Sequence, residues 1–152
     1  MAYDQYAAEA MAPFVPAVPK PNDQTGQQRR SAYYENPKRL YWGQLTGSDV
    51  VLYSVPTAPT LGPAPKVKIT EIVVCNTDSS ACTLTLQIRT VAGGSAAATH
   101  LFSATSFAAN TTTRYEMDTM METLEVISAL AGTASKLNVR ISGIEYLALP
   151  TG

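Results

Sequence analysis

The feature that most constrains the fold is an alternation of apolar and polar residues that recurs in short segments from Tyr41 onward. It is clearest in Cys82–Arg89. The apolar positions there are Cys82, Leu84, Leu86 and Ile88, and the intervening positions are Thr83, Thr85, Gln87 and Arg89. Successive side chains of a β-strand point to opposite faces, so this pattern predicts a strand with one buried and one solvated face.

Strand-like segments rich in β-branched and aromatic residues fill the rest of this region, separated by Gly, Pro, Asn and Ser at intervals of roughly 8–12 residues. After the stretch that begins at Tyr41 they are 49–55, 66–75, 82–89, 99–103, 111–117, 124–129 and 136–146. Residues 118–122 are predicted to be an acidic connection or a single helical turn. No helical crossover is present to support a parallel sheet. The pattern predicts an all-β protein: an antiparallel, jelly-roll-like β-sandwich of about eight strands.

A change of phase inside two of these segments predicts β-bulges, because one extra residue reverses the faces of all that follow. In 66–75 the apolar parity changes between Ile69 and Ile72, which places a bulge near 70–71. In the last segment the parity changes at Gly143, where we expect a second bulge.

Residues 1–40 differ in composition and hold five of the ten prolines. Residues 12–21 predict polyproline II or extended chain, and the polar residues 22–31 predict a solvated linker. We therefore expect a proline-rich N-terminal arm over 1–40 and a β-sandwich domain over 41–152. The arm cannot form a core of its own, so its apolar and basic residues are predicted to bind a partner. These residues are Phe14, Val15, Val18, Arg29, Arg30, Tyr33 and Tyr34.

Aromatic and basic residues gather where the arm meets the domain, and three interpretations remain open. Tyr41 and Trp42 could begin the first strand and cap the core. They could instead anchor a protein interface, where Tyr, Trp and Arg are enriched. They could also stack on single-stranded nucleic acid, but residues 22–40 carry only four basic residues against two acidic ones. Nucleic acid is therefore the least favoured partner.

Overall charge and hydropathy exclude several classes. Eleven basic and twelve acidic residues leave a formal charge of −1, which does not suit a protein that binds nucleic acid through bulk charge. No run of about 18 apolar residues predicts a membrane span. The N-terminus lacks the pattern of a signal peptide, so assembly in a reducing cytoplasm is expected.

Two cysteines and one histidine limit metal and disulfide chemistry. Cys75 and Cys82 would oppose each other if their strands formed a hairpin, but a reducing compartment favours free thiols. Together with His100 they match no zinc-site spacing. We expect no metal and no cofactor.

Carboxylates offer the remaining chemistry. Glu116, Asp118, Glu122 and Glu125 could bind a hard cation, although a solvated loop explains them more simply. Glu71 and Glu145 could form a glycosidase-like pair if their strands were neighbours. Neither set shows a tuned acid and base, and a nucleophilic serine would have only His100 as its base. The sequence predicts no enzyme.

The order of several motifs resembles small β-sandwich virion proteins of tailed bacteriophages. These motifs are Leu52-Tyr-Ser-Val-Pro56, Ile72-Val-Val-Cys-Asn-Thr77, Cys82-Thr-Leu-Thr-Leu86, Ala108-Ala-Asn-Thr-Thr112, Leu124-Glu-Val126 and Asn138-Val-Arg-Ile-Ser-Gly-Ile-Glu145. The resemblance covers residues 45–147 and implies a capsid decoration, neck or tail accessory role without catalytic residues.

From the resemblance and the arm together we expect a homo-oligomer, a trimer or a higher ring. It would bind other capsid, neck or tail proteins in a virion assembled in the bacterial cytoplasm. The alternatives are a neck, tail or baseplate accessory protein and a carbohydrate-binding host-attachment module. The latter would present tyrosines such as Tyr53, Tyr115 and Tyr146 to a sugar.

Overall fold

The computed structural model describes residues 33–58, 63–91 and 98–148, which contain eight β-strands and no helix. The strands are β1 Tyr33–Gln44, β2 Val50–Ser54, β3 Lys66–Asn76, β4 Cys82–Thr90, β5 Thr99–Phe107, β6 Thr112–Met121, β7 Glu125–Ala131 and β8 Leu137–Ala148. The all-β prediction and the number of strands are confirmed.

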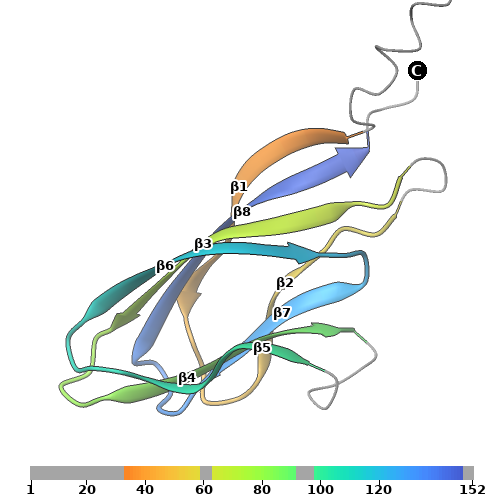
Figure 1. The fold of residues 1–152 in the computed structure, drawn as a ribbon. Helices are drawn as coiled ribbons and strands as arrows, with labels where there is room; N and C mark the ends of the chain where they lie inside the picture. Colours follow the sequence, from red (N-terminus) through yellow and green to blue (C-terminus); the bar gives the residue numbers. More distant parts are fainter. Residues whose placement is uncertain (1–32, 59–62, 92–97, 149–152) are drawn as a thin grey trace, which may run out of the picture. The chain divides into compact units, whose positions relative to one another are not determined.

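The strands form two four-stranded antiparallel sheets, which Figure 1 shows as two layers. Sheet A has the order β1-β8-β3-β6, and sheet B has the order β2-β7-β4-β5. The first strand therefore pairs with the eighth, the second with the seventh, the third with the sixth and the fourth with the fifth. This nested pairing is the strand order of a jelly roll, as predicted.

The core lies between the two sheets and follows from the alternation within each strand. Alternate residues are buried along β8, along most of β4 and on each side of the β3 bulge, including Ile72 and Ile141 of sheet A and Leu84 and Leu86 of sheet B. Burying each such side chain stabilises the fold by roughly 1.5–3 kcal/mol. In β7 the four consecutive residues 126–129 are buried. At one end Phe102, Phe107 and Tyr115 pack as an aromatic cluster, with ring centroids of Phe102 and Tyr115 4.8 Å apart.

The expected bulge in β3 is confirmed, because the pairing of this strand shifts between Ile69 and Glu71. The bulge expected at Gly143 was wrong. In β8 the alternation continues through Gly143 and Glu145, which are both buried. The irregularities lie instead in the flanking strands, where the register shifts between Arg39 and Tyr41 in β1 as well as in β3. Gly143 is needed for space: a Cβ there would lie 2.7 Å from Leu40 Cδ1 and closer still to the carbonyl oxygen of Lys68.

Other expectations need correction. The first strand begins at Tyr33 rather than Tyr41, so residues 33–40 of the expected arm pair with β8. The acidic stretch 118–121 is not a turn but continues β6. Gln87 was expected to face solvent, yet it is only 2% exposed, and its Nε2 donates to Ser128 Oγ at 3.1 Å. The strands of Cys75 and Cys82 belong to different sheets, so no hairpin joins them, and both thiols are free.

Candidate interaction surface on the outer face of sheet A

The outer face of sheet A carries the most exposed aromatic residue in the described part of the chain. Trp42 of β1 is 69% exposed. It is paired in register with Arg140 of β8, which is in turn paired with Val73 of β3. Asn138 lies two residues before Arg140 in β8, and Cys75 lies two residues after Val73 in β3. These two residues are also paired in register and form the next row on the same face. Same-face neighbours in a sheet lie about 5 Å apart across strands, so the five side chains form one continuous patch.

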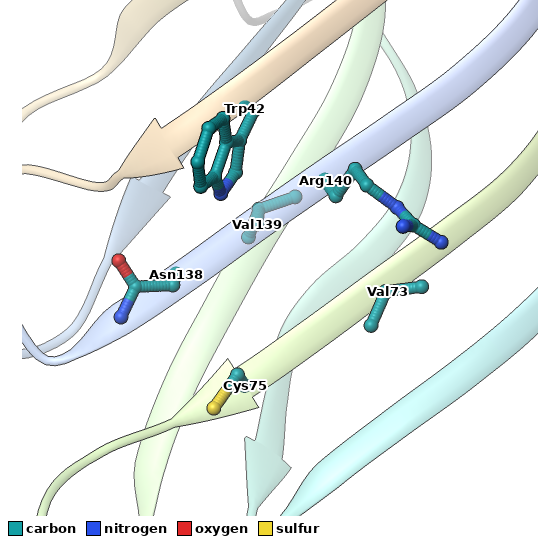
Figure 2. A pocket seen from close by; sticks show the side chains of 6 residues that line it. All are labelled: Trp42, Val73, Cys75, Asn138, Val139 and Arg140. Carbon is teal, nitrogen blue, oxygen red and sulfur yellow. The ribbon is translucent and has the colours of Figure 1, made fainter. Parts of the chain in front are cut away.

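This patch encloses a hollow of about 240 Å³, shown in Figure 2. Its lining residues are Trp42, Val73, Cys75, Asn138, Val139 and Arg140. Figure 2 shows Trp42, Asn138 and Cys75 projecting from three adjacent strands around it. We call this site the Trp42 hollow.

Neighbouring residues set the orientation of Trp42. The guanidinium of Arg39 lies over its ring, 4.9 Å from the centroid, in a cation–π contact. Tyr41 points to the other face of the strand, packs against the core and donates its hydroxyl to Gln44 O at 3.4 Å. Alternation thus separates the two predicted interface anchors: Tyr41 caps the core, whereas Trp42 is free to contact a partner.

An ion-pair network holds Arg140 away from Trp42. Glu71 binds Arg114 Nε at 2.6 Å through one carboxylate oxygen and binds Arg140 through the other. Figure 2 shows the guanidinium of Arg140 directed away from the indole ring. The aliphatic part of Arg140 therefore lines the hollow, and its guanidinium shares the Glu71 carboxylate with Arg114.

Of the seven arm residues predicted to bind a partner, two lie in β1 and five lie outside the described residues. Tyr33 and Tyr34 lie at the start of β1, where the Tyr33 hydroxyl donates to Ala64 O at 3.1 Å and Tyr34 is exposed. Phe14, Val15, Val18, Arg29 and Arg30 lie outside the described residues, so their binding role remains a prediction.

Glu145 occupies a buried polar site on the inner face of sheet A, which the sequence pattern did not reveal. Its side chain accepts hydrogen bonds from Tyr53 Oη at 2.6 Å, Lys38 Nζ at 2.8 Å and Asn36 Nδ2 at 3.1 Å. Asn36 and Lys38 come from β1 and Tyr53 from β2, so this cluster ties sheet A to sheet B. The signal that could have located it is the unbroken alternation of β8 through Gly143.

The environment shifts the pKa values of this cluster. Burial alone would raise the pKa of Glu145, but the hydrogen bonds from Lys38 and Tyr53 outweigh burial and hold it below the ordinary value. Burial, followed by the hydrogen bond to the Glu145 carboxylate, raises the pKa of Tyr53 far above its ordinary value. The carboxylate is thus held ionised and the phenol neutral, an arrangement that stabilises structure.

Glu71 and Glu145 do not form an acid and base pair. Their strands are neighbours, as the hypothesis required, but Glu71 lies on the outer face and Glu145 on the inner face. A groove with two facing carboxylates is therefore absent at this position.

The acidic residues predicted as a possible cation site make separate contacts with different partners. Asp118 pairs with Lys68 at 2.7 Å and Glu122 with Lys66 at 2.9 Å, while Glu125 accepts a hydrogen bond from the Glu122 amide at 2.7 Å. Among the described residues, no three or more His, Cys, Asp or Glu side chains gather as metal ligands.

The tyrosines considered as a sugar platform do not share one surface. Tyr115 packs against Phe102 and Phe107, and Tyr53 is hydrogen-bonded to Glu145. Tyr146 alone lies on the outer face of sheet A, partly buried. The described residues include no helix with the length and hydrophobicity of a membrane span.

Comparisons with known proteins support the fold assignment. No protein-family model matches the chain, and no curated protein matches its sequence. Among solved structures, it is similar to the T13 viral particle of infectious bursal disease virus, with a TM-score of 0.51 and 9% identity over 78% of this chain. A weaker likeness is to the VP2 subviral particle of the same virus, with a TM-score of 0.45 and 12% identity over 75% of this chain.

The match covers 32% of each viral chain, so this protein corresponds to about a third of their length. At 9% identity the first likeness shows a shared β-sandwich fold, and the second is too weak to add to it. Function has to be argued from the site.

Proposed function

We propose that this protein is a non-enzymatic structural component of a tailed-bacteriophage virion, most simply a capsid decoration protein. The observation that carries the proposal is the jelly-roll fold, which is similar to the fold of a viral particle chain. Two features of the described residues support a binding role over a catalytic one. The carboxylates are distributed among ion pairs, and an exposed tryptophan marks a surface suited to a protein partner.

In this proposal the residues before β1 bind neighbouring subunits in a homo-oligomer, a trimer or a higher ring. An extended segment binds through its main chain or through docked prolines, and several weak contacts in a closed ring reinforce one another. The protein would be assembled in the host cytoplasm and retained in the virion, in contact with other capsid, neck or tail proteins.

Sedimentation velocity of the full chain at micromolar concentration tests this function. We expect an oligomer, and we expect deletion of residues 1–30 to dissociate it while the far-UV circular dichroism of the sheets is retained. In the part of the chain that the structure describes, the core side chains lie within residues 40–141, which is why the deletion should leave the domain folded. A monomer at every concentration, or assembly unaffected by the deletion, would overturn the proposal.

Mass spectrometry of purified particles distinguishes a decoration protein from a neck, tail or baseplate protein. A decoration protein should be present in hundreds of copies per particle, because it covers a capsid lattice. A copy number of a dozen or fewer would instead favour the neck or tail position.

A further inference from the structure

The Trp42 hollow combines three chemical properties that suit one class of ligand. An exposed indole forms one wall, and Val73 and the stem of Arg140 supply apolar surface. Trp42 Nε1 and Asn138 Nδ2 are hydrogen-bond donors, and neither has an acceptor among the described residues. The site therefore offers a flat aromatic surface together with unused N–H groups.

A polyproline II strand has the complementary properties. Its backbone carbonyls make no internal hydrogen bonds and can accept from a partner, and its proline rings pack flat on aromatic side chains. It is also already extended, so little conformational entropy is lost when it binds. A helical peptide uses its carbonyls internally and would leave the two donors of the hollow without a partner.

The chain itself contains a matching segment. Pro13, Pro16 and Pro19 are its one run of three prolines spaced by three residues. A polyproline II helix has three residues per turn and rises about 3.1 Å per residue, so these prolines would share one ridge at intervals of about 9 Å.

We propose that residues 13–19 of one copy dock as a polyproline II strand in the Trp42 hollow of a second copy. This inference rests on the proposed self-association and names the surface that receives the neighbouring chain. Thirteen residues, 20–32, connect Pro19 to β1 and span at most about 43 Å, at about 3.3 Å per residue. Trp42 lies nine residues along β1 from Tyr33, or about 30 Å away. Docking within one copy would therefore require the linker 20–32 to fold back alongside β1 and to use about 30 Å of its reach of about 43 Å. Docking on a second copy does not require the linker to fold back.

The chain offers a direct probe, because Trp42 is its only tryptophan. Fluorescence of the full-length protein would be recorded over a dilution series, with acrylamide quenching and sedimentation on the same samples. In the oligomer we expect blue-shifted emission and several-fold weaker quenching, both lost as dilution produces monomers. The triple variant Pro13→Ala, Pro16→Ala, Pro19→Ala should keep red, fully quenchable emission. Pro21→Ala, which removes a proline off the ridge, is the control and should behave as the native chain.

Cys75 provides a second measurement in the same hollow. Its alkylation should slow several-fold in the oligomer and recover in the triple variant, whereas Cys82 is buried in the core in every state. Protection of Cys75 that persists in the triple variant would show that another part of the partner covers the hollow, and would overturn the assignment of residues 13–19.

The remaining outcomes separate this inference from the proposed function. An oligomer whose Trp42 is fully quenchable would overturn the inference and leave the proposed function standing. A blue-shifted Trp42 that persists in the monomer would overturn docking between copies. No oligomer at any concentration would remove the proposed function itself.

Discussion

The two faces of sheet A each contain a glutamate with at least one basic partner, and the two sites differ in burial and in the elements they join. Glu145 on the inner face is 3% exposed and joins two sheets through Lys38, Asn36 and Tyr53. Glu71 on the outer face joins Arg114 and Arg140, whose side chains remain half exposed. The same strands thus produce a structural site on one side and a surface feature on the other.

The difference shows how a jelly roll can carry a binding surface without weakening its core. A buried charge is expensive unless every hydrogen bond is made, so the residues around Glu145 are constrained by folding. Solvent-exposed ion pairs contribute roughly 0–1 kcal/mol each. The residues around Glu71 and Trp42 are consequently free to be selected for a partner.

The largest effect is expected from Glu145→Ala. Removing this carboxylate leaves Tyr53 and Asn36 without their acceptor and Lys38 without its counter-charge. Lys38 is 42% exposed, so the loss should lie at the lower end of the range for broken buried pairs, about 3 kcal/mol of unfolding free energy. Urea denaturation measures it.

Glu71→Ala is the matched control for that experiment, because it removes a carboxylate with two basic partners from the opposite face of the sheet. Its cost should be about 1 kcal/mol or less. Equal losses in the two variants would contradict the contrast between the two faces.

A second large effect is expected from Gly143→Ala. The added methyl group would collide with the Lys68 carbonyl and with Leu40, so the flanking strands must move apart. Overpacking of this kind costs about 2 kcal/mol. Gly47→Ala is the control, since its Cβ would make an ordinary 3.6 Å contact with Ala134 Cβ. If both variants had the melting temperature of the native chain, sheet A would accommodate the added methyl group at Gly143 without loss of stability, and the prediction would be wrong.

The error at Gly143 also shows what the sequence could predict. Ile144 and Tyr146 are apolar, so parity alone placed them inside and implied a bulge. The burial of Glu145 depends on Lys38 and Asn36, more than a hundred positions away in the chain, and on the space that glycine leaves for Leu40. Local alternation was sufficient in β4, where no such long-range partner competes, except at Gln87.

Long-range strand pairing also determines the candidate site, which local alternation could not predict. The sequence predicts one role for Tyr41 and Trp42 as an aromatic pair, and only the pairing of β1 with β8 shows that Tyr41 faces the core and Trp42 the outer face. That pairing extends the first strand back to Tyr33, across Pro37, where proline is tolerated because β1 is an edge strand. The hollow itself requires Val73 and Cys75 from a third strand and had no signal in the sequence.

A moderate effect is expected from pH. The folded pKa of Glu145 is lowered, so its contribution to stability is fully present above the ordinary value near 4.5 and is lost as the pH falls through the folded pKa. Urea midpoints measured between pH 7 and pH 3 should therefore fall less steeply in Glu145→Gln than in the native chain.

The pKa of Asp78 is also lowered, because the Ser80 amide donates a hydrogen bond to its carboxylate, so Asp78→Asn serves as the comparison. Its hydrogen bonds to Ser79 and Ser80 are exposed to solvent, which predicts a smaller change in the acid dependence. If Asp78→Asn flattened the profile more than Glu145→Gln, the buried cluster would not be the main source of acid sensitivity.

The smallest effect on stability is expected from Trp42→Ala, although this substitution removes the largest side chain in the sequence. Trp42 is 69% exposed, and its ring makes a cation–π contact with the guanidinium of Arg39. Surface substitutions of this kind change the unfolding free energy by about 0.5 kcal/mol or less. The urea midpoint should therefore match the native value under conditions where the chain is monomeric, with Tyr41→Ala as the destabilised comparison because Tyr41 packs against the core. A loss of stability in Trp42→Ala equal to that in Tyr41→Ala would mean that the tryptophan supports the fold, and the outer face would then not be free for a partner.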